Sequence, residues 1–240
     1  MEPRAYLGRI RRRLEAVARP GSALLALPGR RMRALALAAL SLVATGAAAS
    51  APGVRIWCLG DSITVRYAHA LAARRPDWTV VDLGLGGERS DEGRARLDRL
   101  LAREEPLPVV AIVIYGANDI VAGRLDHRPG QGPAQAAENL HAIAARLRDA
   151  GIVPIIALPV GAPPPSPTDD PEAHAKLLAL RRGFAELRRA LHREHPRVDF
   201  RLTDKALFVD AVHPSPAGGA ALAARAEAAV ERALRAGFQH

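Results

Sequence analysis

The chain has 240 residues, enough for one well-buried domain, and its 49% hydrophobic and 25% charged residues are typical of a globular protein. The formal net charge of +9 does not indicate nucleic-acid binding, because residues 1–52 hold nine arginines against two acids and the remainder is close to neutral. The single cysteine, Cys58, excludes an intramolecular disulfide and a cysteine-rich metal site, and its apolar neighbours predict a small buried hydrophobe.

Residues 1–52 form a basic N-terminal segment with the parts of a targeting signal. Arg30, Arg31 and Arg33 precede a charge-free apolar run at residues 34–49, which ends in alanines. A positive start, a short apolar middle and small residues at the exit are typical of a secretory signal peptide, cleaved here after Ala49. The run is shorter than the roughly 20 residues that span a bilayer. We therefore expect an exported protein, periplasmic or secreted, with an uncleaved membrane anchor as the alternative.

From residue 53 onward, short apolar runs alternate with stretches of helical spacing, and we treat residues 53–240 as one domain. This alternation indicates an α/β fold with a parallel sheet covered on both faces, since right-handed crossovers place helices there. The nearly continuous apolar run at residues 109–115 fits a strand buried on both sides. The expected strands are 54–59, 78–83, 109–115, 153–158 and 198–202, and the expected helices are 65–74, 91–103, 134–150, 172–195 and 216–236.

The first expected strand leads directly into a turn with a serine. The sequence Gly60-Asp61-Ser62 lies between that strand and a helix. Such a turn lifts the Ser62 hydroxyl out of the sheet, and the helix start supplies unpaired N–H groups, so Ser62 is a candidate nucleophile. An ordinary N-cap is the alternative. Because ligands bind beyond the carboxyl ends of parallel strands, the partners of Ser62 are expected in the other strand-exit loops.

Two of those loops carry hydrogen-bond donors. The second strand is followed by a turn containing Gly84, Gly86 and Gly87, which allows close approach of backbone N–H groups to an anion; a flexible turn is the alternative. A dinucleotide fingerprint fails there, because Arg89 stands where its third glycine would be. The third strand is followed by Asn118, whose amide can donate to a developing oxyanion, or which caps the next turn.

The loop before the last helix supplies a histidine. Of the eight histidines, only His213 combines a strand-exit loop with a nearby carboxylate, that of Asp210. An ordinary surface histidine is the alternative for this position. The scattered histidines lack the spacing of a metal site, so we expect no metal.

Together these four loops resemble the SGNH hydrolases, also called the GDSL esterase/lipase family. The resemblance covers roughly residues 54–236, with its motifs in the family's order. The matching motifs are Gly60-Asp61-Ser62-Ile63-Thr64, the glycine turn ending in Gly87, Gly116-Ala117-Asn118-Asp119 and Asp210-Ala211-Val212-His213-Pro214.

The resemblance implies a three-layer α/β/α sandwich, for which we expect a five-stranded parallel sheet of flavodoxin-like strand order. It also implies that Ser62 attacks an ester carbonyl, that His213 moves the proton and that Asp210 orients the imidazole. The N–H groups of Ser62 and Gly87 and the side chain of Asn118 would form an oxyanion hole. Gly86 is the alternative donor, and register favours Gly87.

The resemblance and the composition together narrow the class of substrate. The family includes hydrolases of simple esters, lysophospholipids, thioesters and acetylated sugars. With only 4% aromatic residues, a long sugar-stacking cleft is disfavoured, so we expect a small acyl ester, lysophospholipid or thioester. A carbohydrate O-acetylesterase and an acyltransferase are the alternatives, and a flavodoxin-like nucleotide binder is disfavoured because Asp61 would repel phosphate. Residues 120–133 and 159–171 are expected to border the pocket. We expect no cofactor, no nucleic-acid partner and a monomer, with membrane association only through the N-terminal segment.

Overall fold

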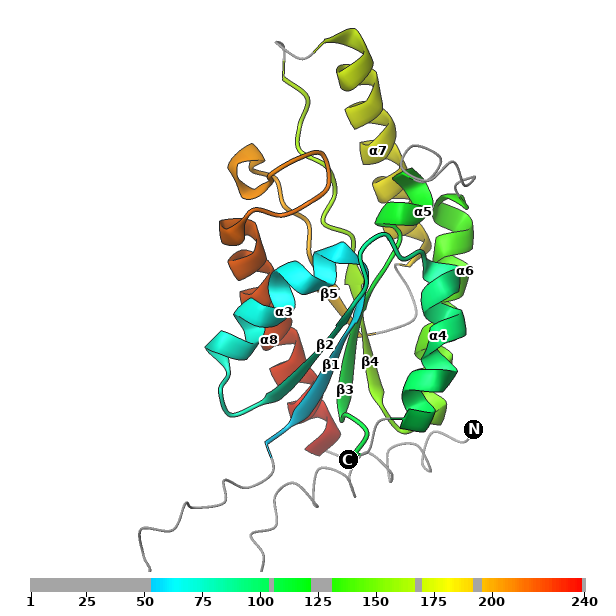
Figure 1. Ribbon diagram of the computed structural model, residues 1–240, viewed down its shortest axis with the longest axis vertical. Helices are drawn as coiled ribbons and strands as arrows, with labels where there is room; N and C mark the ends of the chain where they lie inside the picture. Colours follow the sequence, from blue (N-terminus) through cyan, green and yellow to red (C-terminus); the bar gives the residue numbers. More distant parts are fainter. Residues whose placement is uncertain (1–52, 104–105, 122–130, 167–169, 192–195, 239–240) are drawn as a thin grey trace, which may run out of the picture.

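A computed structural model describes residues 53–103, 106–121, 131–166, 170–191 and 196–238. Its centre is a parallel sheet of five strands in the order β2-β1-β3-β4-β5 (Figure 1). This order confirms the expected α/β fold and the flavodoxin-like arrangement. The strands are β1 (Arg55–Gly60), β2 (Thr79–Gly84), β3 (Val110–Ile114), β4 (Val153–Leu158) and β5 (Arg197–Asp199).

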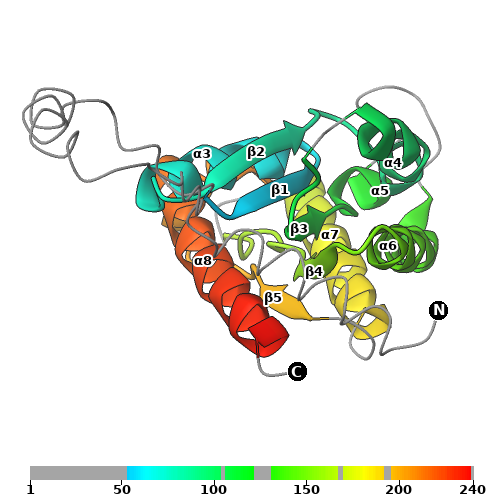
Figure 2. The same ribbon diagram turned by 90° about the horizontal axis from the view of Figure 1, so that it is seen from below.

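Helices cover both faces of the sheet, which gives the expected three layers (Figure 2). One face is covered by α3 (Ser62–Arg74) and α8 (Pro216–Phe238), and the other by α4 (Ser90–Arg103), α6 (Gly132–Asp149) and α7 (Pro171–Ala190). A short helix, α5 (Ala117–Val121), directly follows β3, and a 3-10 turn, η1 (Lys205–Leu207), precedes α8.

Each face of the sheet has its own hydrophobic core. Along β1, Ile56 and Cys58 belong to the core on the α3 and α8 side, whereas Trp57 and Leu59 belong to the core on the α4 and α6 side. All four side chains are fully buried, which explains the continuous apolar character of the strand. The prediction that Cys58 is a buried hydrophobe is confirmed, and burial raises the pKa of its thiol to about 12.

Several element boundaries differ from expectation, including the fourth expected helix, which ends at Ala190 rather than residue 195. The first helix begins at Ser62 rather than residue 65, because Asp61 caps it. The short helix α5 was not expected as a helix. The last strand ends at Asp199 rather than residue 202, although the N–H of Leu202 still donates to the carbonyl oxygen of Val160 at 2.9 Å, so the chain continues alongside the sheet without forming a regular ladder.

Some predictions fall outside the described residues. These include the basic segment 1–52 with its apolar run 34–49, so the signal peptide and the membrane anchor stay predictions. The same holds for residues 122–130 and 167–169 of the expected pocket border and for 192–195 at the end of the fourth expected helix. Within the part of the chain that the structure describes, no helix is both long enough and apolar enough to cross a bilayer.

We expect Leu140→Ala to lower the free energy of unfolding by about 2–5 kcal/mol, because this leucine of α6 is fully buried and its removal leaves a cavity. Urea unfolding followed by circular dichroism measures the change. The matched control is Leu178→Ala on α7, where the side chain is 40% exposed and the cost should stay below that of the core variant. Equal losses for both variants would contradict the assigned core.

Candidate active site

The turn after β1 fixes the position of Ser62. A Cβ at Gly60 would collide with the carbonyl oxygen of Ile114 in the neighbouring strand, so only glycine fits where β1 ends. Asp61 then caps α3, and its Oδ1 accepts a hydrogen bond from the N–H of Ile63 at 2.9 Å. Ser62 is the first residue of α3, where a backbone N–H has no acceptor within the helix. Ser62 therefore lies in the predicted strand-to-helix turn, and its backbone N–H is one of the unpaired donors at the start of α3.

A tight loop before α8 holds His213. The loop is closed by an isolated bridge between Phe208 and Pro214 and by a hydrogen bond from the N–H of Val209 to the carbonyl oxygen of His213 at 2.9 Å. At its turn, Oδ1 of Asp210 accepts hydrogen bonds from the N–H groups of Val212 and His213 at 2.9 and 2.8 Å. The carboxylate thus organises the backbone of the loop that carries the imidazole.

The structure brings the three predicted residues into one hydrogen-bonded chain. Ser62 Oγ lies 2.9 Å from His213 Nε2, and His213 Nδ1 lies 2.7 Å from Asp210 Oδ2. Burial alone would raise the pKa of Asp210, but its two backbone N–H donors and the imidazole lower it. An ionised Asp210 fixes the tautomer with a proton on Nδ1, which leaves Nε2 free to accept the serine proton.

Close packing of α8 against α3 makes this contact possible, although 151 positions separate Ser62 from His213 in the sequence. A Cβ at Gly219 would approach the carbonyl oxygen of Arg66 in α3 to 2.5 Å, and one at Gly218 would collide with the carbonyl oxygen of Leu207. Two consecutive glycines at the start of α8 therefore let this helix approach both α3 and the histidine loop. Sequence analysis did not assign them a role, although a glycine pair inside a helix is a recognisable signal of close packing.

The glycine turn and Asn118 lie together beside the serine turn. Gly87 has a φ of +77°, a left-handed conformation that favours glycine. The N–H of Leu85, at the start of this turn, donates to the carbonyl oxygen of Gly60 at 2.9 Å. Asn118 Nδ2 donates to the carbonyl oxygen of Glu88 at 3.0 Å, which uses one of its two amide protons and leaves the other available. The predicted donors thus come from loops that are bonded to one another.

A buried ion pair anchors the residue after Gly87, and sequence analysis missed it. The Glu88 carboxylate accepts hydrogen bonds from Arg96 Nε at 2.8 Å, Arg96 Nη2 at 2.6 Å and the Tyr115 hydroxyl at 2.7 Å. Arg96 Nη2 also donates to the carbonyl oxygen of Leu83 at 2.8 Å. The side chains of Glu88 and Arg96 are only 7% and 14% exposed. A tyrosine at the end of an apolar strand needs a polar partner, and this was the available signal.

Asp119 organises the neighbouring turn. Its carboxylate accepts a 2.6 Å hydrogen bond from the Ser90 hydroxyl and a 3.1 Å bond from the Ser90 N–H at the start of α4. Burial raises the pKa of Asp119, and the bonds from Ser90 oppose that rise. Asn139 of α6 donates to the same Ser90 hydroxyl at 3.0 Å, so α4, α5 and α6 are joined behind the glycine turn.

Asp61 is the most perturbed carboxyl group of the site. It is fully buried, and its Oδ2 has no hydrogen-bond partner among the described residues. Burial raises its pKa from 3.8 to about 7, the Ile63 N–H opposes the rise, and the charges of Asp119 and Glu88 add to it. The proton that Asp61 retains below pH 7 lowers the negative charge beside Ser62.

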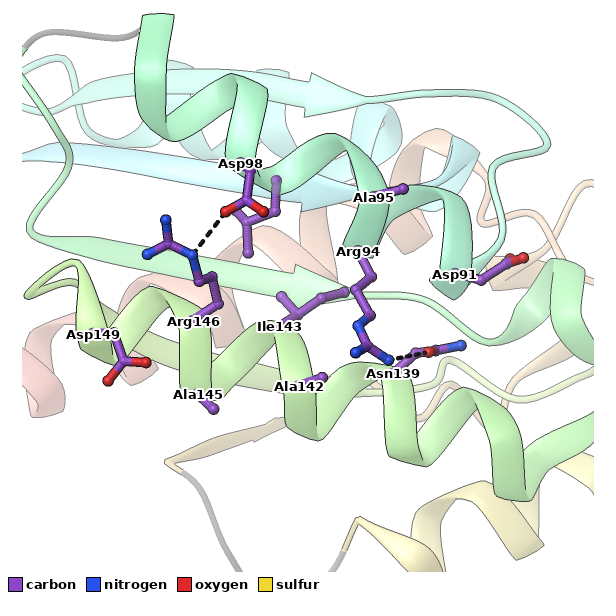
Figure 3. Close-up of a pocket in the computed structure, with 11 residues that line it drawn as sticks. Asp91, Arg94, Ala95, Asp98, Asn139, Ala142, Ile143, Ala145, Arg146 and Asp149 are labelled. Carbon is purple, nitrogen blue, oxygen red and sulfur yellow. Dashed lines mark hydrogen bonds and ion pairs between the residues drawn. The ribbon is translucent and has the colours of Figure 1, made fainter. Parts of the chain in front are cut away.

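Two cavities in the described part of the chain lie away from the serine. Figure 3 shows one of them, a groove of about 650 Å³ between α4 and α6, where Arg146 pairs with Asp98 and Arg94 donates to Asn139. The other lies beyond β4 and β5 and contains Arg188. Neither is lined by the hydrogen-bonded serine or histidine. No group of three potential metal ligands occurs within the described ranges.

Comparison with known proteins places these loops in a family. The family described as "GDSL-like Lipase/Acylhydrolase family" matches residues 58–221, which is most of the chain. The chain belongs to this GDSL-like lipase/acylhydrolase family. Membership identifies it as a hydrolase that acts on ester bonds, and the expected family is confirmed. No curated protein matches the chain in the sequence comparison.

Solved structures of GDSL-like and related esterases share this fold at low sequence identity. The aryl esterase of M. smegmatis has a TM-score of 0.58 and 21% identity, with coverage of 75% of this chain and 99% of that one. An acetyl xylan esterase, AlAXEase, has a TM-score of 0.57 and 15% identity, covering 74% and 100%. TesA has a TM-score of 0.52 and 22% identity, covering 74% and 98%. At these identities the likeness concerns the fold.

We expect the pH dependence of stability to report on Asp61. Its raised pKa means that the folded protein keeps a proton that the unfolded chain releases, so stability should fall as the pH rises from about 4 to 7. The contribution is at most about 1.4 kcal/mol per pH unit. Asp61→Asn, which keeps a capping side chain, should remove this slope in urea unfolding measured at several pH values. Asp204→Asn, at the exposed cap of η1, should keep this slope. If the unfolding free energy of Asp61→Asn varies with pH as that of the wild type does, the assignment to Asp61 is refuted.

We expect Arg96→Met to destabilise the protein by about 3–5 kcal/mol, because it leaves the buried Glu88 carboxylate without its cation. Adding Glu88→Gln to this variant should restore part of the loss. The control is Arg146→Met, which breaks an exposed pair with Asp98 and should cost less than about 1 kcal/mol. Denaturant unfolding measures all three, and an equal cost for the exposed and buried pairs would rule out the anchoring role.

Proposed function

We propose that Ser62, His213 and Asp210 form the catalytic triad of a serine esterase that hydrolyses small acyl esters, lysophospholipids or thioesters through an acyl-enzyme. The observation that supports it is the continuous chain from Ser62 Oγ through both ring nitrogens of His213 to Asp210, with separations of 2.9 and 2.7 Å. These are hydrogen-bond distances at which a proton can move from a hydroxyl to an imidazole.

In the first half of the proposed reaction, Ser62 Oγ attacks the acyl carbonyl carbon and His213 Nε2 accepts the hydroxyl proton. The ionised Asp210 carboxylate stabilises the imidazolium that forms. When the tetrahedral intermediate collapses, the imidazolium returns the proton to the leaving alcohol or thiol. Water then attacks the acyl-enzyme with His213 as base, and the carboxylic acid leaves as Ser62 regains its proton.

The negatively charged oxygen of the tetrahedral intermediate needs hydrogen-bond donors, which form an oxyanion hole. We assign this role to the N–H groups of Ser62 and Gly87 and to the second amide proton of Asn118. The positive end of α3 adds to the stabilisation of negative charge at this place. Losing one such donor typically reduces the rate by about 10²–10³-fold.

Exposed apolar side chains favour an acyl substrate over a glycan. Four large hydrophobic residues of the described part are exposed, and three of them flank the proposed catalytic groups. Val65 lies one turn along α3 from Ser62, Leu85 begins the glycine turn, and Val209 precedes Asp210. Such side chains can contact the hydrocarbon of an acyl group or leaving group, whereas a sugar needs polar or aromatic contacts.

A carbohydrate O-acetylesterase and an acyltransferase remain the competing proposals for this site. The first draws support from the fold shared with an acetyl xylan esterase. The second uses the same acyl-enzyme with an alcohol in place of water. Product analysis with acetylated xylan, and with an added alcohol acceptor, separates both from the ester hydrolase.

We expect the full chain to hydrolyse p-nitrophenyl acetate, butyrate and octanoate. The longer esters should have a higher kcat/KM, because Val65, Leu85 and Val209 offer apolar contacts to the acyl chain. Ser62→Ala and His213→Ala should each lower kcat at least about 10³-fold without changing the circular dichroism spectrum. Release of nitrophenolate followed at 405 nm gives the rates.

The matched control is His69→Ala, which removes an exposed histidine of α3 whose Nε2 lies 3.7 Å from Asp82. This variant should keep wild-type activity. Unchanged hydrolysis in Ser62→Ala would refute the nucleophile, and loss of activity in His69→Ala equal to that in His213→Ala would refute the assigned base.

A further inference from the structure

A second cavity lies beyond the carboxyl ends of β4 and β5. It has a volume of about 330 Å³ and is bounded by the loop after β4, by α7 and by the segment after β5. Its charged lining consists of Arg181 and Arg188 from α7 and Arg201 from the segment after β5, and none of its lining residues is acidic. Three guanidinium groups therefore border one small hollow.

Only one of these three arginines is neutralised by a carboxylate. Arg201 Nη2 lies 2.6 Å from Asp199 Oδ2, in a side-chain ion pair. Arg181 Nη1 and Arg188 Nη2 instead donate to the carbonyl oxygens of Ala162 and Pro159, at 3.0 and 2.8 Å. Within the described ranges neither forms an ion pair. A carbonyl oxygen orients a guanidinium without cancelling its charge, so the cavity keeps about two positive charges.

Mutual repulsion among these groups raises the free energy of the empty cavity. The pKa of Arg188 is lowered by burial and then by the charges of Arg201 and Arg181, with Asp199 opposing them. A guanidinium stays protonated at physiological pH, so the protein keeps this repulsion rather than losing a proton. An anion placed among the three groups would replace repulsion with attraction.

The high arginine content of the chain does not by itself account for this arrangement. Several arginines of other described elements pair with carboxylates, for example Arg75 with Asp77 and Arg96 with Glu88. Here the two on α7 are held by the backbone of a loop in which Gly161 adopts a φ of +87°, and a Cβ at this glycine would lie 3.2 Å from Arg188 Nη2. The loop and the arginines thus fix each other, and the cations are positioned before any ligand arrives.

The lining combines cations with an apolar floor and a hydroxyl. Phe184 and Leu202 are buried beneath the cavity, and Thr203 contributes an exposed side chain at its edge. Planar guanidinium groups match the oxygens of a phosphoryl group, and an apolar floor suits the carbon atoms of a phosphate ester. We propose that this cavity is an anion-binding site that takes a phosphoryl group, either as free phosphate or at the end of a small phosphate ester.

The proposal does not depend on the acyl chemistry and can be tested without it. Inorganic phosphate and glycerol 3-phosphate are titrated into the full chain by isothermal calorimetry, against sodium chloride of equal ionic strength, and Tm is followed in parallel. We expect saturable binding and a rise in Tm with phosphate but not with chloride. Ser62→Ala should bind equally well. Tighter binding of glycerol 3-phosphate would identify an ester as the ligand, and equal binding would identify free phosphate.

Three variants connect the binding to the cavity. Arg181→Met and Arg188→Met should each weaken phosphate binding at least about 10-fold, because each removes a charge-assisted donor. Arg189→Met is the matched control, since it removes the same charge from an exposed neighbouring position of α7 that does not line the cavity, and it should bind as wild type does. Arg181 is exposed, so its replacement tests the site even where Arg188→Met fails to fold. Equal binding by wild type and Arg181→Met, or an equal effect of chloride, would overturn the proposal.

Discussion

The contact between α3 and α8 is the constraint on which the site depends. The parallel sheet places Ser62 at the end of β1, but the sheet alone supplies no histidine there. Glycine at position 219 lets α8 lie against the carbonyl oxygen of Arg66, and glycine at position 218 makes room for the loop before it. The imidazole of His213 reaches the serine only because these two helices share one face of the sheet. Packing between helices, rather than local sequence, brings the two groups together.

Three carboxyl groups near the serine turn are buried, and the protein limits their negative charge. Three acids, Asp61, Glu88 and Asp119, lie near one another behind the proposed oxyanion donors. Each is stabilised in its own way: Glu88 by a cation and a tyrosine, Asp119 by hydrogen bonds from Ser90, and Asp61 by retaining its proton at neutral pH or below. The site proposed to stabilise a transient negative charge can thus tolerate carboxyl groups close by, because little of their charge is uncompensated.

Much of the fold and of the candidate site was predictable from the sequence, for a physical reason. Strands buried on both sides have a strong apolar signal, and parallel order brings their exits to one edge, so chemically distinctive residues such as Ser62 and Asn118 could be expected near each other. The anchoring of Glu88 by Arg96 could not, because it depends on side-chain directions across a turn and a helix. The end of β5 was misjudged because apolar alternation continues after the regular ladder ends.

The link between the first and last described helices also has a consequence for biosynthesis. His213 follows Ser62 by 151 positions and is followed by α8, so a ribosome must synthesise all the intervening strands and helices, and then α8, before the imidazole can meet the serine. A nascent or C-terminally truncated chain would carry the serine turn in an inert form. In this order of assembly the proposed nucleophile meets its proposed base only after α8 has been synthesised.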